Sequence, residues 1–273
     1  MLYVTGDTHG ALDIRKLNTT NFPEQYSMTK EDYVAIMEDF GLVWDDSKED
    51  LYWRKWLAGK NFTTLFIDGN HENFALLKRY EVVEWHGGKV HFINDSIIRL
   101  MRGQVYEIDG QKVFAMGGAP SVDEKYRIAG KSWWPEEKPS YEEYKEALRN
   151  LEKHNWKVDC VFTHTISNNI MRLMQYKKEA SEINNFFDLI EEKLTFKHWY
   201  FGHFHADEQV KHKYRLLYID VIRKEAQLPL KVIDCEVKTM MDPEESRELI
   251  KYIDIPKYGL ALVQLTGIFW IRA

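Results

Sequence analysis

Short apolar runs that end in polar residues recur along the first part of this chain. The first run, Leu2–Thr5, is rich in strand-forming residues and leads into Gly6-Asp7-Thr8-His9-Gly10. Because side chains alternate along an extended segment, we expect Asp7 and His9 to project toward the same side. Four later runs also predict strands with polar residues at their ends: Tyr33–Met37, Thr63–Ile67, Cys160–Phe162 and His198–Phe201.

Helices are predicted between these strands. Ser47 with Asp50 is typical of a capped helix start, and this helix is expected to run through Leu57 and to close at Gly59. Four further helices are predicted at Ala11–Asn18, Asn73–Arg79, Ser140–His154 (opened by a Ser140 and Glu143 cap) and Ala180–Lys193. Strands that alternate with helices favour a layered α/β fold, in which sites gather at the carboxyl ends of strands.

The middle and the end of the chain have a different pattern. Short strands are predicted at Val90–Ile93, Ile97–Met101, Gln104–Ile108, Lys112–Met116 and Tyr214–Val221, with Asp109-Gly110 as a hairpin turn. Beyond about Arg223 the sequence predicts a strand at Val232–Val237, a short helix at Pro243–Lys251 and a hairpin of Leu260–Leu265 with Ile268–Arg272. We therefore divide the chain into a main domain, 1–222, and a C-terminal extension, 223–273, whose role is unknown.

Composition narrows the class of protein. The chain has 273 residues, of which 44% are hydrophobic, which suits a sizeable core and excludes a disordered protein. Its formal net charge of −6 argues against a generally basic nucleic-acid-binding protein but leaves a local basic groove open. Cys160 and Cys235 are the only cysteines, which fits a reducing compartment. No signal-peptide pattern and no membrane-spanning stretch is found, so we expect a soluble, cytoplasmic protein with no membrane partner.

Side chains that can bind a metal ion follow five of the predicted strands. A lone Asp-x-His pair is usually a hydrogen-bonded turn, and His164 alone would more often be a structural histidine. Gly-x-His-x-His at 202–205 is a stronger signal, because two imidazoles at this spacing share a face. The ordered set of metal-competent side chains indicates a metal site: Asp7, His9, Asp39, Asn70, His71, His164, His203 and His205. This mixture of oxygen and nitrogen ligands suits manganese, iron or zinc better than calcium.

Five blocks of this sequence resemble the motifs of the calcineurin-like metallophosphoesterases. They are Gly6-Asp7-Thr8-His9-Gly10, Glu38-Asp39-Phe40-Gly41, Gly69-Asn70-His71-Glu72, Thr163-His164 and Gly202-His203-Phe204-His205. The resemblance covers the chain to about residue 222 and implies a two-sheet β-sandwich flanked by helices, with two divalent metal ions at the strand ends. It implies one metal ion held by Asp7, His9, Asp39 and His205, and a second held by Asp39, Asn70, His164 and His203.

The same resemblance implies a metal-dependent hydrolase of phosphate esters that uses a metal-bound hydroxide, with Asp39 and His71 as catalytic residues. A carboxylate such as Asp39 can bridge two metal ions because it has two oxygens, and His71 is placed by the resemblance beside the leaving group, where a histidine can act as a general acid. Glu38 is a departure, since the family usually has glycine there, and we expect it to support the ligands or to shape a turn. Leu42, Val43 and Trp44 stand where protein Ser/Thr phosphatases carry an arginine.

A long loop, Gly117–Pro139, is predicted to form one wall of the substrate pocket, and its proposed substrate contacts are Arg127, Lys131 and Trp134. The favoured substrate is a phosphorylated small molecule or nucleotide. A nuclease-like phosphodiesterase is an alternative, because the cationic and indole side chains can bind a nucleic-acid backbone and its bases. In a third interpretation, Trp133 and Trp134 pack over the core as a lid. A catalytically inactive binding or scaffold module of the same fold is a further alternative, and the oligomeric state stays unknown.

Overall fold

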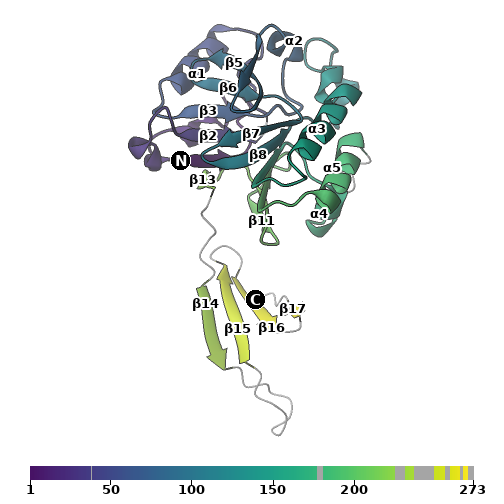
Figure 1. The fold of residues 1–273 in the computed structure, drawn as a ribbon. Coiled ribbons are helices and arrows are strands. Elements are labelled where there is room, and N and C mark those ends of the chain that lie inside the picture. Colours follow the sequence, from purple (N-terminus) through teal and green to yellow (C-terminus); the bar gives the residue numbers. More distant parts are fainter. Residues whose placement is uncertain are drawn as a thin grey trace. The chain divides into compact units, whose positions relative to one another are not determined.

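The computed structural model describes residues 1–37, 39–176 and 181–224, and the backbone of four strands in the remaining chain. The chain divides into two compact units, Met1–Arg223 and Lys224–Ala273 (Figure 1). The boundary between these units lies one residue beyond the end of the predicted main domain. Glu38 lies outside the described residues.

The first unit contains two mixed sheets. The seven-stranded sheet has the order β13-β1-β2-β3-β6-β5-β4. Its strands are β1 (Leu2–Thr5), β2 (Tyr33–Ile36), β3 (Thr63–Phe66), β4 (Val82–Trp85), β5 (Gly88–Asn94), β6 (Ile97–Leu100) and β13 (Ile222–Arg223). β1, β2, β3 and β6 run parallel to one another, so the carboxyl ends of β1, β2 and β3 meet at one edge.

The second sheet has six strands in the order β11-β12-β10-β9-β8-β7. They are β7 (Gln104–Ile108), β8 (Gln111–Met116), β9 (Cys160–Thr163), β10 (His198–Phe201), β11 (Glu208–Val210) and β12 (Tyr214–Leu216). Here β8, β9, β10 and β12 are parallel neighbours. This sheet therefore also brings the carboxyl ends of several strands together.

Helices cover the outer faces of both sheets (Figure 1). The α-helices are α1 (Lys48–Ala58), α2 (Phe74–Leu77), α3 (Tyr141–Lys153), α4 (Asn168–Leu173) and α5 (Glu182–Lys193). Four 3₁₀ turns accompany them: η1 (Ile14–Leu17), η2 (Pro23–Ser27), η3 (Glu124–Tyr126) and η4 (Pro135–Glu137). The predicted caps are confirmed, because Ser47 accepts a hydrogen bond from the Asp50 amide and Ser140 forms a capping box with Glu143.

Alternating side chains of the strands fill three apolar layers. Leu65 and Phe162 lie in the layer between the sheets, whereas Phe66 packs on the α1 side and Val161 on the side of α3, α4 and α5. All four side chains are completely buried. The prediction of an α/β fold with two sheets is confirmed.

Several element boundaries differ from the predictions. β4, β11 and α4 were not predicted, because they are short and, in β4, apolar side chains such as Val82 are exposed. The predicted helix at Ala11–Asn18 is reduced to the 3₁₀ turn η1. The predicted strand Tyr214–Val221 ends at Leu216.

The second unit holds a four-stranded antiparallel sheet of β14 (Lys231–Glu236), β15 (Leu249–Ile255), β16 (Gly259–Gln264) and β17 (Gly267–Phe269), in that order. The pairing of Gln264 with Gly267 confirms the predicted hairpin, although Leu265 and Thr266 lie outside the described residues. The predicted helix Pro243–Lys251 is wrong in its described part, Leu249–Lys251, which belongs to β15. The three isoleucines and the tyrosine of β15 favour a strand over a helix.

No helix among the described residues is long and apolar enough to cross a membrane.

A buried ion network holds the end of β3. The Asp68 carboxylate is fully buried and accepts hydrogen bonds from Arg99 Nη2 at 2.6 Å and from Arg102 Nε at 2.7 Å. Burial acts to raise the pKa of Asp68, but the two guanidinium groups lower it below its ordinary value. The Asp68 carbonyl also accepts from the Gly118 amide at 2.8 Å. This network fixes the chain two residues before Asn70.

We predict that His91 makes stability depend on pH. Its Nδ1 lies 3.3 Å from Arg99 Nη1, and burial together with the Arg99 charge lowers the pKa of His91 to about 4. The unfolded chain therefore binds this proton more readily than the folded chain. The contribution of neutral His91 to the free energy of unfolding is fully present above about pH 6.5 and is lost as the pH drops toward 4. The loss should approach about 3 kcal/mol.

His91→Gln keeps an acceptor for Arg99 without a titrating ring, so its free energy of unfolding should vary less over this range. Urea unfolding of the parent and His91→Gln across the range measures the difference. His212→Gln, which changes an exposed histidine, is the control. Equal pH slopes for the parent and His91→Gln would refute the assignment.

Candidate metal centre

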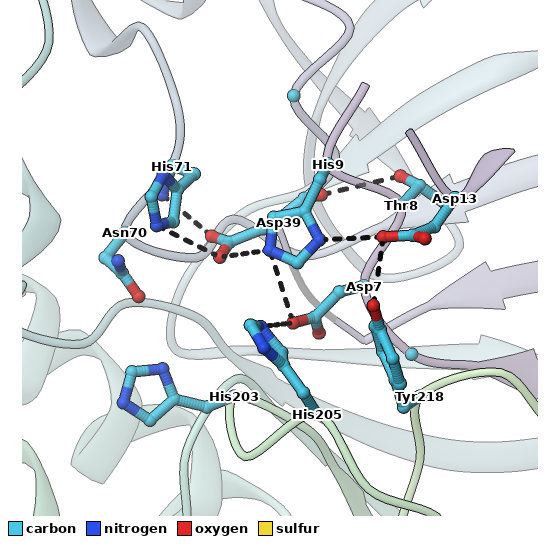
Figure 2. A network of polar contacts seen from close by, with 12 residues as sticks. Asp7, Thr8, His9, Asp13, Asp39, Asn70, His71, His203, His205 and Tyr218 are labelled. Atoms are coloured by element: carbon cyan, nitrogen blue, oxygen red, sulfur yellow. Dashed lines mark hydrogen bonds and ion pairs between the residues drawn. The ribbon is translucent and has the colours of Figure 1, made fainter. Parts of the chain in front are cut away.

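The predicted metal ligands converge where the ends of strands from both sheets meet. β1 leads to Asp7 and His9, β2 to Asp39 and β3 to Asn70, while β9 leads to His164 and β10 to His203 and His205. In Figure 2 the Asp39 carboxylate lies at the centre of this cluster, between His71 and His9. The structure therefore brings all seven predicted metal ligands into one region.

The first group of ligand atoms surrounds Asp7, and we call it the Asp7 group. Asp7 Oδ2 lies 2.9 Å from His205 Nε2 and 3.6 Å from His9 Nε2. His9 Nε2 is also 3.6 Å from Asp39 Oδ2. Ligand atoms bound at about 2.1 Å from one cation are about 3.0 to 3.4 Å apart, so this spacing fits a metal ion.

The second group of ligand atoms surrounds Asn70, and we call it the Asn70 group. His164 Nε2 lies 2.8 Å from Asn70 Oδ1, 3.1 Å from His203 Nδ1 and 3.9 Å from Asp39 Oδ1. Asp39 thus turns Oδ2 toward the Asp7 group and Oδ1 toward the Asn70 group. A carboxylate placed between two ligand groups in this way is suited to bridge two cations.

The backbone around these ligands is held in unusual conformations. His9, His203 and His205 all have positive φ angles, of 42°, 71° and 48°. These values lie in the left-handed region, which residues other than glycine rarely adopt. Gly69 allows a close approach, because a Cβ there would lie 2.0 Å from Asp39 Oδ1. These strained backbone conformations let the side chains of the predicted ligands converge.

Three residues that the sequence analysis missed support the Asp7 group: two orient its histidines and one holds the backbone at Asp7. Asp13 Oδ2 lies 3.1 Å from His9 Nδ1, which leaves Nε2 of that ring facing the carboxylates. The Tyr218 hydroxyl donates to Asp13 at 3.4 Å, and the Tyr218 ring stacks on His205 with 5.1 Å between ring centres. Buried Lys16 donates to the carbonyls of Gly6 and Asp7. Asp13 follows His9 by four residues, a weak signal, whereas the sequence offers none for Tyr218.

Glu72 supports the segment that carries Asp39. Its fully buried carboxylate accepts from the Phe40 amide at 2.6 Å and from the Gly41 amide at 3.3 Å. Burial raises the pKa of Glu72 well above its ordinary value. Asp39 Oδ1 in turn accepts from the His71 amide at 2.7 Å. Glu72 lies in a recognised motif block, but its sequence position did not reveal this role.

In this cluster the neighbouring ionisable groups shift one another's pKa values. Burial acts to raise the pKa of Asp39, but His164, His9 and His71 lower it well below its ordinary range. Burial acts to lower the pKa of His9, but Asp39, Asp7 and Asp13 raise it to about 9. The carboxylates around the His9 ring therefore favour a positive charge at this place. A divalent cation at the same place offers stronger compensation of the same kind.

The loop Gly117–Pro139 places its predicted substrate contacts differently. Arg127 lies at the site, with Nη2 3.0 Å from His71 Nε2, and it lines an open hollow of about 590 Å³ together with Trp133. Lys131 is exposed. Trp134 is only 5% exposed and packs edge-on against Trp44, which favours the core-packing interpretation over a substrate contact for this side chain.

Neither the models of known protein families nor the curated proteins compared with this chain gave a match. The residues of the first unit define an α/β fold with two sheets and a candidate site lined by carboxylates and imidazoles at the strand ends.

We predict that Trp134→Ala lowers the free energy of unfolding by about 3 to 5 kcal/mol, because it empties a buried position in the core. Urea unfolding followed by far-ultraviolet circular dichroism measures the change. Lys131→Ala, an exposed position on the same loop, should stay within about 0.5 kcal/mol of the parent. Similar stabilities for the two variants would mean that Trp134 is not part of the core.

Proposed function

We propose that the protein is a metal-dependent hydrolase of phosphate esters, of the calcineurin-like metallophosphoesterase type, that binds one divalent cation at the Asp7 group and one at the Asn70 group. The observation that carries this proposal is the position of Asp39, whose two oxygens face the two ligand groups. Carboxylate, imidazole and amide-oxygen ligands suit manganese, iron or zinc. Two such cations supply an activated water and neutralise charge on the phosphoryl oxygens.

The chain's own side chains add a binding surface for the substrate. The His71 side chain is 39% exposed, and its Nε2 lies 4.0 Å from Asp39 Oδ2, at the open side of the cluster. The Arg127 guanidinium beside it offers a fixed positive charge with several donors for phosphate oxygens. His71 lies where a histidine can donate a proton to the leaving oxygen, and Arg127 is placed to orient the phosphate. Burial lowers the pKa of His71, as does the Arg127 charge, and the negative charge of a bound phosphate ester acts in the opposite direction.

A small phosphorylated molecule or nucleotide fits this site better than a long nucleic acid. Trp134 is buried, so its indole ring does not offer an open face on which a base can stack. The formal charge of −6 gives no general attraction for a polyanion. An inactive scaffold module is disfavoured because all seven predicted ligands are present and converge.

The test is a panel of substrates assayed with the full chain. The protein is stripped with a chelator and then supplied with Mn²⁺, Fe²⁺ or Zn²⁺, and the panel contains aryl phosphate monoesters and diesters, nucleotides and short single-stranded DNA and RNA. We expect two bound metal ions per chain and metal-dependent turnover of a small ester. Two bound ions without turnover of any substrate would favour the scaffold alternative, and a chain that binds no metal ion would refute the proposal.

We predict that Asp39→Asn is the most damaging conservative substitution. An amide of the same shape brings no negative charge to either ligand group, so affinity at both cation sites should fall, by about a hundredfold or more. His9→Ala removes a ligand of the Asp7 group alone and should leave one site occupied. Metal analysis and turnover measure both variants, after circular dichroism confirms their fold. Two metal ions and near-parental turnover in Asp39→Asn would exclude Asp39 as the bridge.

We predict that His71→Ala keeps both metal ions and lowers kcat by about 10²- to 10⁴-fold, because it removes the proton donor for the leaving oxygen. The loss should be larger for alkyl esters, whose leaving groups are poor, than for nitrophenyl esters. Steady-state kinetics on a series of leaving groups measures this trend. His212→Ala, at an exposed position, is the control. Equal losses across the series would assign His71 another role.

A further inference from the structure

A chain of hydrogen bonds joins the loop Gly117–Pro139 to Asn70. Asn70 Nδ2 donates to Ser121 Oγ at 3.2 Å, and Ser121 Oγ donates to Glu137 Oε2 at 2.6 Å. The Ser121 amide also donates to Glu137 Oε2, at 3.2 Å. All three side chains are buried, and Glu137 is completely so. These contacts lie on the side of Asn70 opposite to its oxygen, which faces His164.

The direction of these hydrogen bonds fixes which end of the Asn70 amide faces the ligand group. Only the oxygen of an asparagine amide can bind a cation, and a half-turn of the amide would present its NH₂ group instead. The single hydroxyl hydrogen of Ser121 is given to the Glu137 carboxylate. Ser121 Oγ is therefore left as an acceptor for Asn70 Nδ2, so Oδ1 must face His164.

We propose that Ser121 and Glu137 are positioning residues for Asn70, which make the loop Gly117–Pro139 part of the metal centre as well as a wall of the substrate pocket. This inference rests on the proposed function. It assigns to Glu137 the task of orienting a metal ligand through Ser121, from a loop that is remote in sequence from the motif of Asn70.

The burial of Glu137 supports this role. A buried carboxyl group is costly, and Glu137 Oε1 has no hydrogen-bond partner within the described part of the chain. Burial raises the pKa of Glu137 to about 7, against the opposing effects of Ser121 and Arg127. A proton on Oε1 still leaves Oε2 as the acceptor for Ser121, so the hydrogen-bond direction holds in both protonation states.

Glu137 is itself tied to the strand that carries Asn70. Arg102 Nη2 lies 3.5 Å from the Glu137 carbonyl, and Arg102 also binds Asp68 at the end of β3. Asp68 precedes Asn70 by two residues. Asn70, Ser121, Glu137, Arg102 and Asp68 thus form a closed ring of contacts, which holds the orienting carboxylate at a fixed place relative to the ligand.

The experiment compares Ser121→Ala and Glu137→Met, which removes the acceptor for Ser121, with two matched controls in the full chain. Ser121→Thr keeps the hydroxyl, and Glu136→Gln changes the neighbouring glutamate of the same turn, whose partner is Lys78. Calorimetric titration of the stripped proteins with Mn²⁺ gives the affinity of each site. Ser121→Ala should weaken one of the two sites by about 10- to 100-fold and leave the other unchanged, with Ser121→Thr and Glu136→Gln close to the parent.

The order of the hydrogen bonds, from Glu137 through Ser121 to Asn70, gives a second test. Because Glu137 acts through Ser121, the double variant Ser121→Ala/Glu137→Met should bind Mn²⁺ no more weakly than Ser121→Ala alone. A metal-free measurement accompanies it: the side-chain NH₂ resonances of Asn70, assigned with Asn70→Asp, should shift in Ser121→Ala and stay in place in Glu136→Gln. Thermal unfolding of the stripped proteins checks their fold, and Glu137→Met carries the test if Ser121→Ala does not fold.

The outcomes separate this inference from the proposed function. Two Mn²⁺ sites in the parent with the same affinities in Ser121→Ala and Glu137→Met would overturn the positioning role and leave the proposed function intact. Equal weakening in Glu136→Gln, or additive losses in the double variant, would also overturn it. A parent chain that binds no Mn²⁺ would overturn the proposed function and this inference with it.

Discussion

The carboxylate of Asp39 is the group on which the candidate site depends. It is only 2% exposed, and a buried negative charge is tolerated only where donors and opposite charges surround it. Its surroundings come from both sheets, since His9 follows β1 in one sheet and His164 follows β9 in the other. The two sheets must therefore keep a fixed relation for Asp39 to stay compensated, and the three apolar layers maintain that relation.

Much of the remaining polar structure holds the strand ends that surround Asp39. Glu72 binds the amides that follow Asp39, and Lys16 binds the carbonyls around Asp7. Asp68 binds two arginines beside Asn70. Each of these ionisable groups is buried, which costs free energy, and each fixes backbone next to a predicted ligand. Burial of these groups therefore lowers the stability of the fold, but it fixes the geometry of the site.

The candidate site residues and the main strands could be predicted from the sequence because both signals are local. Asp7, Asn70 and His203 each follow an apolar run after a short turn that contains glycine, and parallel strands bring such ends to one edge. The supporting contacts were not readable. Tyr218 reaches Asp13 across 205 positions, and Ser121 reaches Asn70 across 51. Serine, tyrosine and aspartate are common in loops, so their types gave no hint of which partner the fold would supply.

Trp134 shows why a loop's composition did not predict its function. An indole beside cationic residues suggested a substrate contact, yet one face of the loop turns inward, and Trp134 and Glu137 lie on that face. Arg127 on the other face approaches His71. Ion pairs of Glu136 with Lys78 and of Lys138 with Glu124 add further ties. A wall fixed in this way is formed before a substrate arrives, so little of the binding free energy is lost to ordering it.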